Sequence, residues 1–317
     1  MLGKRHASRV PPDARRSAFD GRVRSPSVIA RIGGLLACAL ILSTRIAAAG
    51  AAPAQNPPPP QRILLVGDST AETMFPFLRD AAAARGVDIE SAARIGCSVI
   101  DGDPKLDDGR PYVDIYGDTS QCDAITSSDQ DRLLATQRPD VVVWLSEWEA
   151  WPNRVLDGQL VHFGTIPGNK AILAHIDAAV ARLTAGGARV VFLPTAPRAY
   201  PSVRGLAHPA GDARIVQLAK LLRSYARQHT DKASLIDLPT ILQCPTGHTC
   251  PAEVGPGIRP RNLDGFHFDG DGAVWLADQV MSMLVGTTPP PAPPAPPACG
   301  TASLGDGRPA SAGAECA

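Results

Sequence analysis

The sequence predicts an α/β protein in which a parallel sheet lies between two layers of helices. Short stretches are apolar nearly throughout, as in strands covered on both faces, and in longer stretches between them apolar residues recur at helical spacing. Strands that alternate with helices are joined by right-handed crossovers, which produces a three-layer α/β/α sandwich. Ligand sites in such sheets lie at the carboxyl ends of the strands.

Five segments have the character of buried strands and predict a five-stranded parallel sheet. They span residues 62–66, 87–92, 141–145, 189–193 and 234–238. Helices are expected over 70–85, 169–184 and 212–229, and a last one begins at Asp271. Two insertions, 101–121 and 148–168, interrupt the alternation; we expect loops there, at strand ends where substrate walls are built.

The folded domain is expected to span residues 61–286, between two flanks of different composition. In residues 1–60, basic side chains precede an apolar run at 32–42, and small-residue patterns that a signal peptidase accepts follow at 47–49 and 52–54. Because the run is short and Arg45 follows it closely, we expect a secretory signal and a Pro-rich linker, with an uncleaved membrane anchor as the alternative. A secreted or cell-envelope location follows.

Residues 287–317 are predicted to be a disordered Pro/Ala-rich tail. Proline and alanine fill positions 289–298 almost without interruption, a composition that favours extended polyproline and buries no core. The two termini are therefore candidates for association with a membrane or cell wall. The 31 Lys and Arg residues balance the 31 Asp and Glu residues, so the charge does not favour nucleic acid as a partner.

Cysteine usage supports an oxidising compartment. Apart from Cys38 the number is even, and nearest-neighbour pairing would join Cys97 with Cys122, Cys244 with Cys250 and Cys299 with Cys316. His248 lies between Cys244 and Cys250, so a zinc site is the alternative for that pair. We favour a disulfide because no fourth ligand of matching spacing accompanies them.

A serine stands at the end of the first predicted strand. The apolar run at 63–66 leads directly into Gly67, Asp68 and Ser69, and a helix-permissive segment follows. The Ser69 hydroxyl is then at the carboxyl end of a strand. Its N–H lies at a helix start, where unpaired donors and the positive dipole end stabilise an oxyanion. One residue therefore serves as candidate nucleophile and oxyanion donor.

A candidate base lies just before the last helix. Asp264 and His267 are three residues apart, so the carboxylate can fix the imidazole tautomer and stabilise its charged form. A serine hydroxyl needs such a base, because it is a weak nucleophile alone. In the structural alternatives, residues 269–271 cap the helix while His267 packs in a loop, or Asp264, His267 and Asp271 bind a metal.

At these residues the sequence resembles the SGNH or GDSL hydrolase superfamily, over nearly all of 61–285. The resemblance rests on residues 67–69, on Gly96 after the second strand, and on residues 264–267. Residues 144–149 look more narrowly like the secreted actinobacterial type that is also fused to acyltransferase-3 proteins. The resemblance implies a flavodoxin-like sheet, a triad of Ser69, His267 and Asp264, an oxyanion hole from the N–H groups of Ser69 and Gly96, and no metal or organic cofactor.

One block departs from the superfamily pattern. After the third strand the superfamily has Gly-x-Asn-Asp, whose Asn side chain donates to the oxyanion, and Trp148 occupies that Asn position here. Loss of such a donor typically costs about 2.7–4 kcal/mol of transition-state stabilisation. The hydroxyl of Ser146 or a backbone N–H is the candidate replacement.

The same block supplies the predicted substrate wall. This wall comprises Trp148, Glu149 and Trp151; the tryptophans either form an aromatic platform for a sugar or pack against the adjacent loop. Ionised Glu147 and Glu149 would oppose an oxyanion unless they turn away or pair with a cation. The candidate cations are Arg94 and Arg154.

Together these features predict a secreted serine-dependent carboxylic-ester hydrolase that acts through an acyl-serine on a small acyl ester or O-acylated saccharide. An O-acyltransferase acting on an envelope polysaccharide is the first alternative, because it shares the intermediate. A non-catalytic carbohydrate-binding protein of the same fold is the second alternative.

Overall fold

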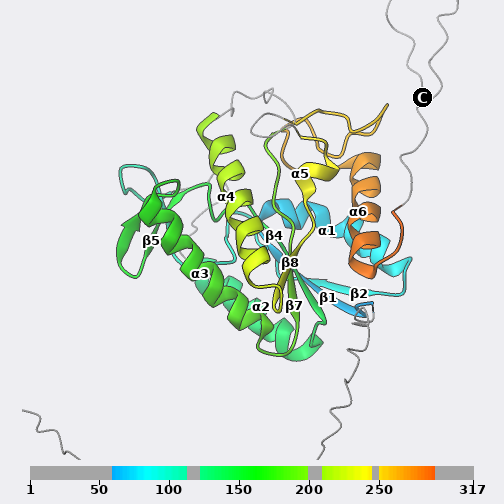
Figure 1. Cartoon of the computed structure of the whole chain (residues 1–317), viewed down its shortest axis with the longest axis horizontal. Coiled ribbons are helices and arrows are strands. Elements are labelled where there is room, and N and C mark those ends of the chain that lie inside the picture. The colour runs from blue at the N-terminus through cyan, green and yellow to red at the C-terminus, as the bar shows by residue number, and fades with distance from the viewer. Residues whose placement is uncertain (1–58, 113–121, 199–208, 245–249, 290–317) are drawn as a thin grey trace, which may run out of the picture. The chain divides into compact units, whose positions relative to one another are not determined.

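A five-stranded parallel sheet forms the centre of the protein (Figure 1). The computed structural model describes residues 59–112, 122–198, 209–244 and 250–289. The strands are β1 (Arg62–Gly67), β2 (Asp88–Ser91), β4 (Val141–Leu145), β7 (Arg189–Phe192) and β8 (Ala233–Leu235). They lie in the order β2-β1-β4-β7-β8, with every pairing parallel, which is the flavodoxin-like order. The predicted fold class is confirmed.

Helices cover both faces of this sheet (Figure 1). One face carries α1 (Ser69–Ala83) and α6 (Gly270–Val285), and the other carries α2 (Cys122–Gln137), α3 (Ile166–Thr184) and α4 (Pro209–Gln228). Successive strand side chains alternate between the layers: Leu65 and Val143 face α1 and α6, whereas Leu64 and Val142 face the opposite core. Both strand faces are therefore apolar.

The helix α2 has no counterpart among the helices expected from the sequence. Its buried positions Cys122, Thr126, Gln130 and Leu133 follow helical spacing, but two of them are polar. An arginine of α3, Arg182, donates to the Gln130 side chain, so the buried amide oxygen is satisfied. The helix thus packs through a stripe that a search for apolar periodicity does not detect.

The sequence predicts a separate loop for each insertion, but in the structure the two insertions pair with each other. Strand β3 (Asp103–Lys105) of the first pairs with β5 (Asn153–Leu156) of the second, and β5 pairs with β6 (Gln159–Val161), in an antiparallel three-stranded sheet. Arg154 of β5 is 1% exposed, and its guanidinium donates to the carbonyls of Gly102 and Trp148. Backbone pairing and a buried cation therefore join the insertions.

The last predicted strand is shorter than expected. Residue 238, its expected final position, instead begins the short helix α5 (Leu238–Ile241). Asp237 stands at the helix N-cap, and a proline occupies the first turn, where its missing N–H leaves no bond unmade. The expected strand therefore stops three residues early.

Two cysteine pairs are disulfide-bonded, Cys97 with Cys122 and Cys244 with Cys250. The expected pair of Cys299 and Cys316 lies outside the described residues, and so do residues 1–58, with the expected signal or anchor, and residues 290–317 of the expected tail. Within the described ranges, no helix combines the length and apolar character that crossing a membrane requires.

The two disulfides differ in the chain length that they close, so their removal should differ in effect. The first spans 25 residues and the second spans 6. From loop-closure entropy we expect Cys97→Ser/Cys122→Ser to lower the free energy of unfolding by about 3.5 kcal/mol, and Cys244→Ser/Cys250→Ser by about 2 kcal/mol. Urea denaturation without reductant measures both, and a larger loss for the shorter loop would contradict the expectation.

Candidate active site

Ser69 is presented by a tight turn between β1 and α1. The strand ends at Gly67 and the helix begins at Ser69. A Cβ atom on Gly67 would lie 1.8 Å from the Leu145 carbonyl oxygen and 2.8 Å from the Ala71 Cβ, so only glycine allows this close approach of β1 to the end of β4. The serine consequently stands at the carboxyl end of the sheet.

The structure brings together Ser69, His267 and Asp264. The Nε2 atom of His267 lies 2.9 Å from Ser69 Oγ, although the two residues are 198 positions apart in the chain. Its Nδ1 atom lies 2.6 Å from Asp264 Oδ2. When Nδ1–H donates to Asp264, the Nε2 lone pair faces the serine hydroxyl, which is the tautomer that a general base requires.

Electrostatics keep Asp264 ionised and His267 basic. Burial alone would raise the pKa of Asp264, but hydrogen bonds from the His267 ring and from the N–H groups of Phe266 and His267 outweigh it and lower the pKa to about 2. The hydrogen bond to Asp264 raises the pKa of His267 against the opposing effect of burial. The imidazolium that forms on proton uptake is therefore stabilised where it arises.

The side chain of Asp68 joins the serine turn to the end of β4. It is 0% exposed and stands at the N-cap of α1. One oxygen, Oδ1, accepts from the N–H and hydroxyl of Thr70 at 2.8 and 2.6 Å. The other, Oδ2, accepts from the Ser146 hydroxyl at 3.1 Å and from the N–H groups of Glu147 and Trp148 at 2.8 and 2.9 Å. Five donors thus hold one buried carboxylate.

This arrangement corrects the expectation for residues 146–149, the segment after the third predicted strand, which we call the third block. The Ser146 hydroxyl, which we had expected as an oxyanion donor, is engaged by Asp68, and so are the N–H groups of Glu147 and Trp148. A buried carboxylate requires such donors, because an unpaired one is strongly destabilised. The alternative of a backbone N–H from this turn therefore fails at the same two residues.

The sequence placed Glu149 in the substrate wall, but its side chain is buried and bonds to the backbone of another loop. It is 1% exposed, its Oε1 accepts from the Val99 N–H at 2.8 Å, and burial raises its pKa. The nearby cation is Arg154, one of the two expected partners, whose charge favours the ionised form of Glu149. The other expected partner, Arg94, pairs with Asp129.

The loop that carries Gly96 is fixed beside the serine turn. The Arg94 N–H donates to the Gly67 carbonyl at 2.9 Å, and the Ile95 N–H donates to the Glu72 carboxylate of α1 at 3.1 Å. Gly96 has a φ of 70°, a left-handed conformation that glycine adopts without strain. In the described part of the chain, no acceptor bonds the N–H of Ser69 or of Gly96.

Aromatic rings form one side of the site. Trp148 is 9% exposed and meets the ring of Tyr112 edge-on at 5.5 Å, so it packs inside the insertion rather than presenting an open face. Trp151 is partly exposed; its indole N–H donates to the Tyr112 hydroxyl, and its ring contacts Phe266, whose centroid is 6.2 Å from that of His267. Of the predicted wall, Trp151 therefore lies toward the triad.

Sequence reasoning missed Tyr112 and Phe266 as wall residues. Phe266 lies between Asp264 and His267 in the chain, and this position was the available signal. Nothing in the sequence marks Tyr112, which reaches the tryptophans because β3 and β5 pair. Its role depends on a contact between two insertions that are distant in the chain.

Within the described residues, no group of three or more His, Cys, Asp or Glu side chains is placed to hold a metal ion. The structure does not favour Asp264, His267 and Asp271 as metal ligands. The two ring nitrogens of His267 instead contact Asp264 and Ser69. Asp269 does cap α6, as one structural alternative proposed. The zinc alternative involves His248, which lies outside the described residues.

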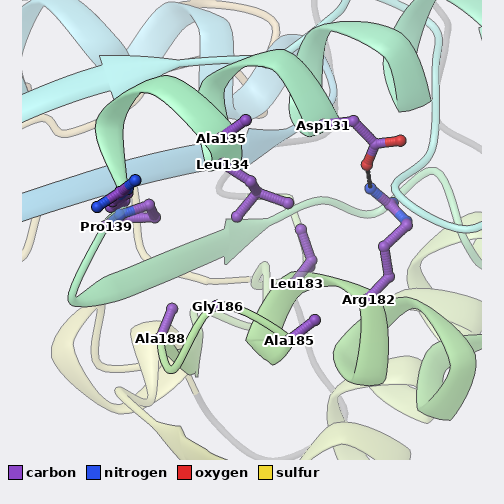
Figure 2. Close-up of a pocket in the computed structure, with 10 residues that line it drawn as sticks. Asp131, Leu134, Ala135, Pro139, Arg182, Leu183, Ala185, Gly186 and Ala188 are labelled. Carbon is purple, nitrogen blue, oxygen red and sulfur yellow. Dashed lines mark hydrogen bonds and ion pairs between the residues drawn. The ribbon is translucent and has the colours of Figure 1, made fainter.

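A separate hollow of ≈ 390 Å³ lies away from the triad (Figure 2). Pro139 and Ala188, which precede β4 and β7, line it, so it lies at the amino ends of the strands, opposite Ser69. Figure 2 shows the ion pair of Asp131 and Arg182 at its edge. No serine, threonine, cysteine or lysine is among its lining residues. It therefore offers no candidate nucleophile.

A strand-end serine, a histidine and an aspartate thus meet at the carboxyl end of a buried parallel sheet. The family model described as "SGNH domain (fused to AT3 domains)" matches residues 37–282, and the chain belongs to this family. The family is one of SGNH-fold hydrolases and acyltransferases. No curated protein matches the chain.

Several solved structures are similar to the chain. The periplasmic domain of the Salmonella ser. Paratyphi A lipopolysaccharide acetyltransferase has a TM-score of 0.45 and 15% identity, over 71% of this chain and 82% of that one. A GDSL-like lipase from Bacteroides thetaiotaomicron VPI-5482 has a TM-score of 0.45 and 12% identity, over 71% and 87%. A carbohydrate acetylesterase family member from Sinorhizobium meliloti has a TM-score of 0.43 and 15% identity, over 71% and 99%.

The role of Asp68 as a connector can be separated from its role as a helix cap. Asparagine caps helices as well as aspartate does, but in Asp68→Asn the amide NH₂ would face donors that need an acceptor. We expect this variant to lose about 3 kcal/mol of unfolding free energy, measured by urea denaturation. The matched control is Asp269→Asn at the exposed cap of α6, which we expect to be nearly neutral. Equal stability of the two variants would contradict the connector role.

Proposed function

We propose that the protein is a serine-dependent carboxylic-ester hydrolase that acts through an acyl-serine intermediate. The observation that carries this proposal is the alignment of His267 between Ser69 Oγ, at 2.9 Å, and Asp264 Oδ2, at 2.6 Å. A serine, a base and a group that orients the base are the components that nucleophilic ester cleavage requires.

In the acylation step, Ser69 Oγ forms a bond to the acyl carbonyl carbon while its proton moves to His267 Nε2. The carbonyl oxygen becomes an oxyanion, which the N–H groups of Ser69 and Gly96 stabilise. Asp264 stabilises the imidazolium, consistent with the raised pKa of His267. The carbon–oxygen ester bond then breaks, and the leaving alkoxide takes the proton from His267.

In the deacylation step, water repeats the role of the serine. His267 accepts a proton from water as the hydroxide oxygen bonds to the acyl carbon, and the same two N–H groups hold the second oxyanion. The bond to Ser69 Oγ breaks, the serine regains its proton from His267, and the carboxylic acid leaves. All three groups return to their starting protonation states.

Because of the third block, the proposed oxyanion hole has fewer hydrogen-bond donors than the superfamily pattern provides. Ser146 and the neighbouring N–H groups are held by Asp68, so two amide donors remain. One missing donor typically costs about 2.7–4 kcal/mol of transition-state stabilisation. We therefore expect slower turnover than the same triad would give with an asparagine donor.

We place the enzyme outside the cytoplasm, as a secreted or cell-envelope protein, with a small acyl ester or O-acylated saccharide as substrate. The two disulfides suit an oxidising compartment. The N-terminal apolar run and its small-residue sites provide the expected export signal. The Pro-rich segments at both ends would serve as spacers to a membrane or cell wall.

Acyl transfer to an envelope saccharide is the second candidate, because it uses the same acyl-serine. The partly exposed rings of Phe266, which lies beside His267, and of Trp151, which contacts Phe266, favour it, since the C–H faces of a sugar pack well on aromatic rings. The family description also associates such domains with AT3 domains. Mass spectrometry of acyl-loaded protein, offered water or oligosaccharides, distinguishes them: transfer well above hydrolysis would replace our first candidate.

Removal of the nucleophile tests the triad directly. We expect Ser69→Ala to lose turnover of a short-chain aryl ester and labelling by a fluorophosphonate probe, while its circular dichroism spectrum stays unchanged. The matched control is Ser127→Ala on α2, which we expect to keep wild-type turnover. Unchanged turnover of Ser69→Ala would refute the assignment, and absence of wild-type labelling would favour a non-catalytic carbohydrate-binding protein.

The pH profile tests the role of Asp264. Neutral His267 is the base, so activity should rise as pH increases through a pKa that Asp264 holds above 6.5. In Asp264→Asn that support is lost, so the midpoint should move to lower pH and kcat should fall by roughly 10³–10⁴-fold. Asp271→Asn, in the first turn of α6, is the control. A midpoint at the wild-type pH or above would contradict this role.

A further inference from the structure

A single buried guanidinium connects the loop of Asp264 and His267 to the segment that follows β7. Arg261 is 8% exposed. Its Nη1 donates to the carbonyl oxygens of Gly265 at 3.1 Å and Pro197 at 2.5 Å, and its Nη2 donates to that of Ala196 at 3.1 Å. All three acceptors are backbone atoms, so the contact constrains the chain path itself.

The Gly265 carbonyl lies within the Asp264–His267 loop. This loop is a narrow hairpin: residues 261 and 268 pair as an antiparallel bridge, and the Asn262 N–H donates to the His267 carbonyl at 2.9 Å. The Gly265 N–H donates back to the Asn262 carbonyl at 3.0 Å. The side chain of Arg261 therefore reaches from the base of the hairpin to its tip.

Charged groups from several elements surround this guanidinium. Glu147, after β4, together with Asp212 of α4 and Asp264, favours the charged form of Arg261, whereas burial lowers its pKa to about 10. Arg198 is a second cation near Glu147, and its guanidinium stacks 4.1 Å over the ring of Phe266. Arg261 thus remains protonated at neutral pH.

We propose that Arg261 is a positioning residue that holds the Asp264–His267 pair in register with Ser69. This inference rests on the proposed function, since it concerns the same triad. Arg261 contacts neither Ser69 nor the His267 ring; it acts through the Gly265 carbonyl. The planar fork of arginine donates to carbonyls on two segments in a fixed geometry, which the single ammonium of lysine does not reproduce.

Two consequences of losing Arg261 have opposite signs, so they can be separated. Removal of its positive charge would favour the imidazolium and raise the pKa of His267. Loosening of the hairpin would weaken the hydrogen bond to Asp264, which is the main cause of the raised pKa of His267, and so lower that pKa. A lysine keeps the charge and loses the fork, so it isolates the positional effect.

The test compares Arg261→Lys with Arg85→Lys. Arg85 also joins two elements: it donates to Asp278 and Ser282 of α6 from the end of α1, away from the triad. We expect Arg261→Lys to lower kcat about 10²-fold with little change in KM, as a displacement of about 1 Å does, and to move the pH midpoint down. We expect Arg85→Lys to lower Tm without changing kcat or the pH midpoint.

Wild-type kcat and pH midpoint in folded Arg261→Lys would overturn the proposal, because Arg261 would then have only a structural role. Arg261→Gln is the second variant, since its amide can donate to one carbonyl without a buried charge; we expect the same reduced kcat, and wild-type kcat would overturn the proposal. Failure of both variants to fold, while Arg85→Lys folds, would also overturn it, because Arg261 would then support the fold as a whole.

An NMR titration of the His267 ring separates this inference from the proposed function. If the wild type has no serine-dependent turnover, the hydrolase proposal fails, but the ring pKa is still measurable in wild type and Arg261→Lys. A lower ring pKa in the variant supports the positioning role. An unchanged or higher value overturns that role, whatever the outcome with the ester.

Discussion

The buried carboxylate of Asp68 is the constraint on which the rest of the site depends. A carboxylate with no exposed surface must be surrounded by donors, and the chain supplies them from the start of α1 and from the turn after β4. To satisfy this charge, the two strand ends must stay in contact. The serine is thereby held at the carboxyl end of β1. The turn at Ser146–Trp148 is held by its hydrogen bonds to Asp68.

A second constraint of opposite charge holds the other half of the triad. Arg261 gathers three carbonyls around the hairpin of Asp264 and His267, while Asp68 gathers donors around Ser69. Glu147 interacts with both charges: burial and then Asp68 raise its pKa, and Arg261 opposes that rise. The 2.9 Å contact of His267 with Ser69 is the place where the two halves meet. Asp68 thus contacts the chain on the serine side of this bond, and Arg261 contacts it on the histidine side.

The sequence predicted those parts of the molecule that depend on local pattern. The strands could be recognised because both of their faces are apolar, and the strand-end position singled out Ser69. Other parts depend on contacts between distant segments. Helix α2 packs through Thr126 and Gln130, and β3 exists only because β5 pairs with it. Likewise, the engagement of Ser146 by Asp68 leaves no mark on the sequence near either residue.

The edges of the sheet have a consequence for behaviour at high concentration. The outer strands are β2, of four residues, and β8, of three, so each exposes only a short row of unpaired backbone groups. β2 also carries Asp88 and Glu90. A second chain that added to either edge would gain few hydrogen bonds and, at β2, would meet two carboxylates. The central strands are almost wholly apolar, yet the sheet offers little template for edge-to-edge aggregation.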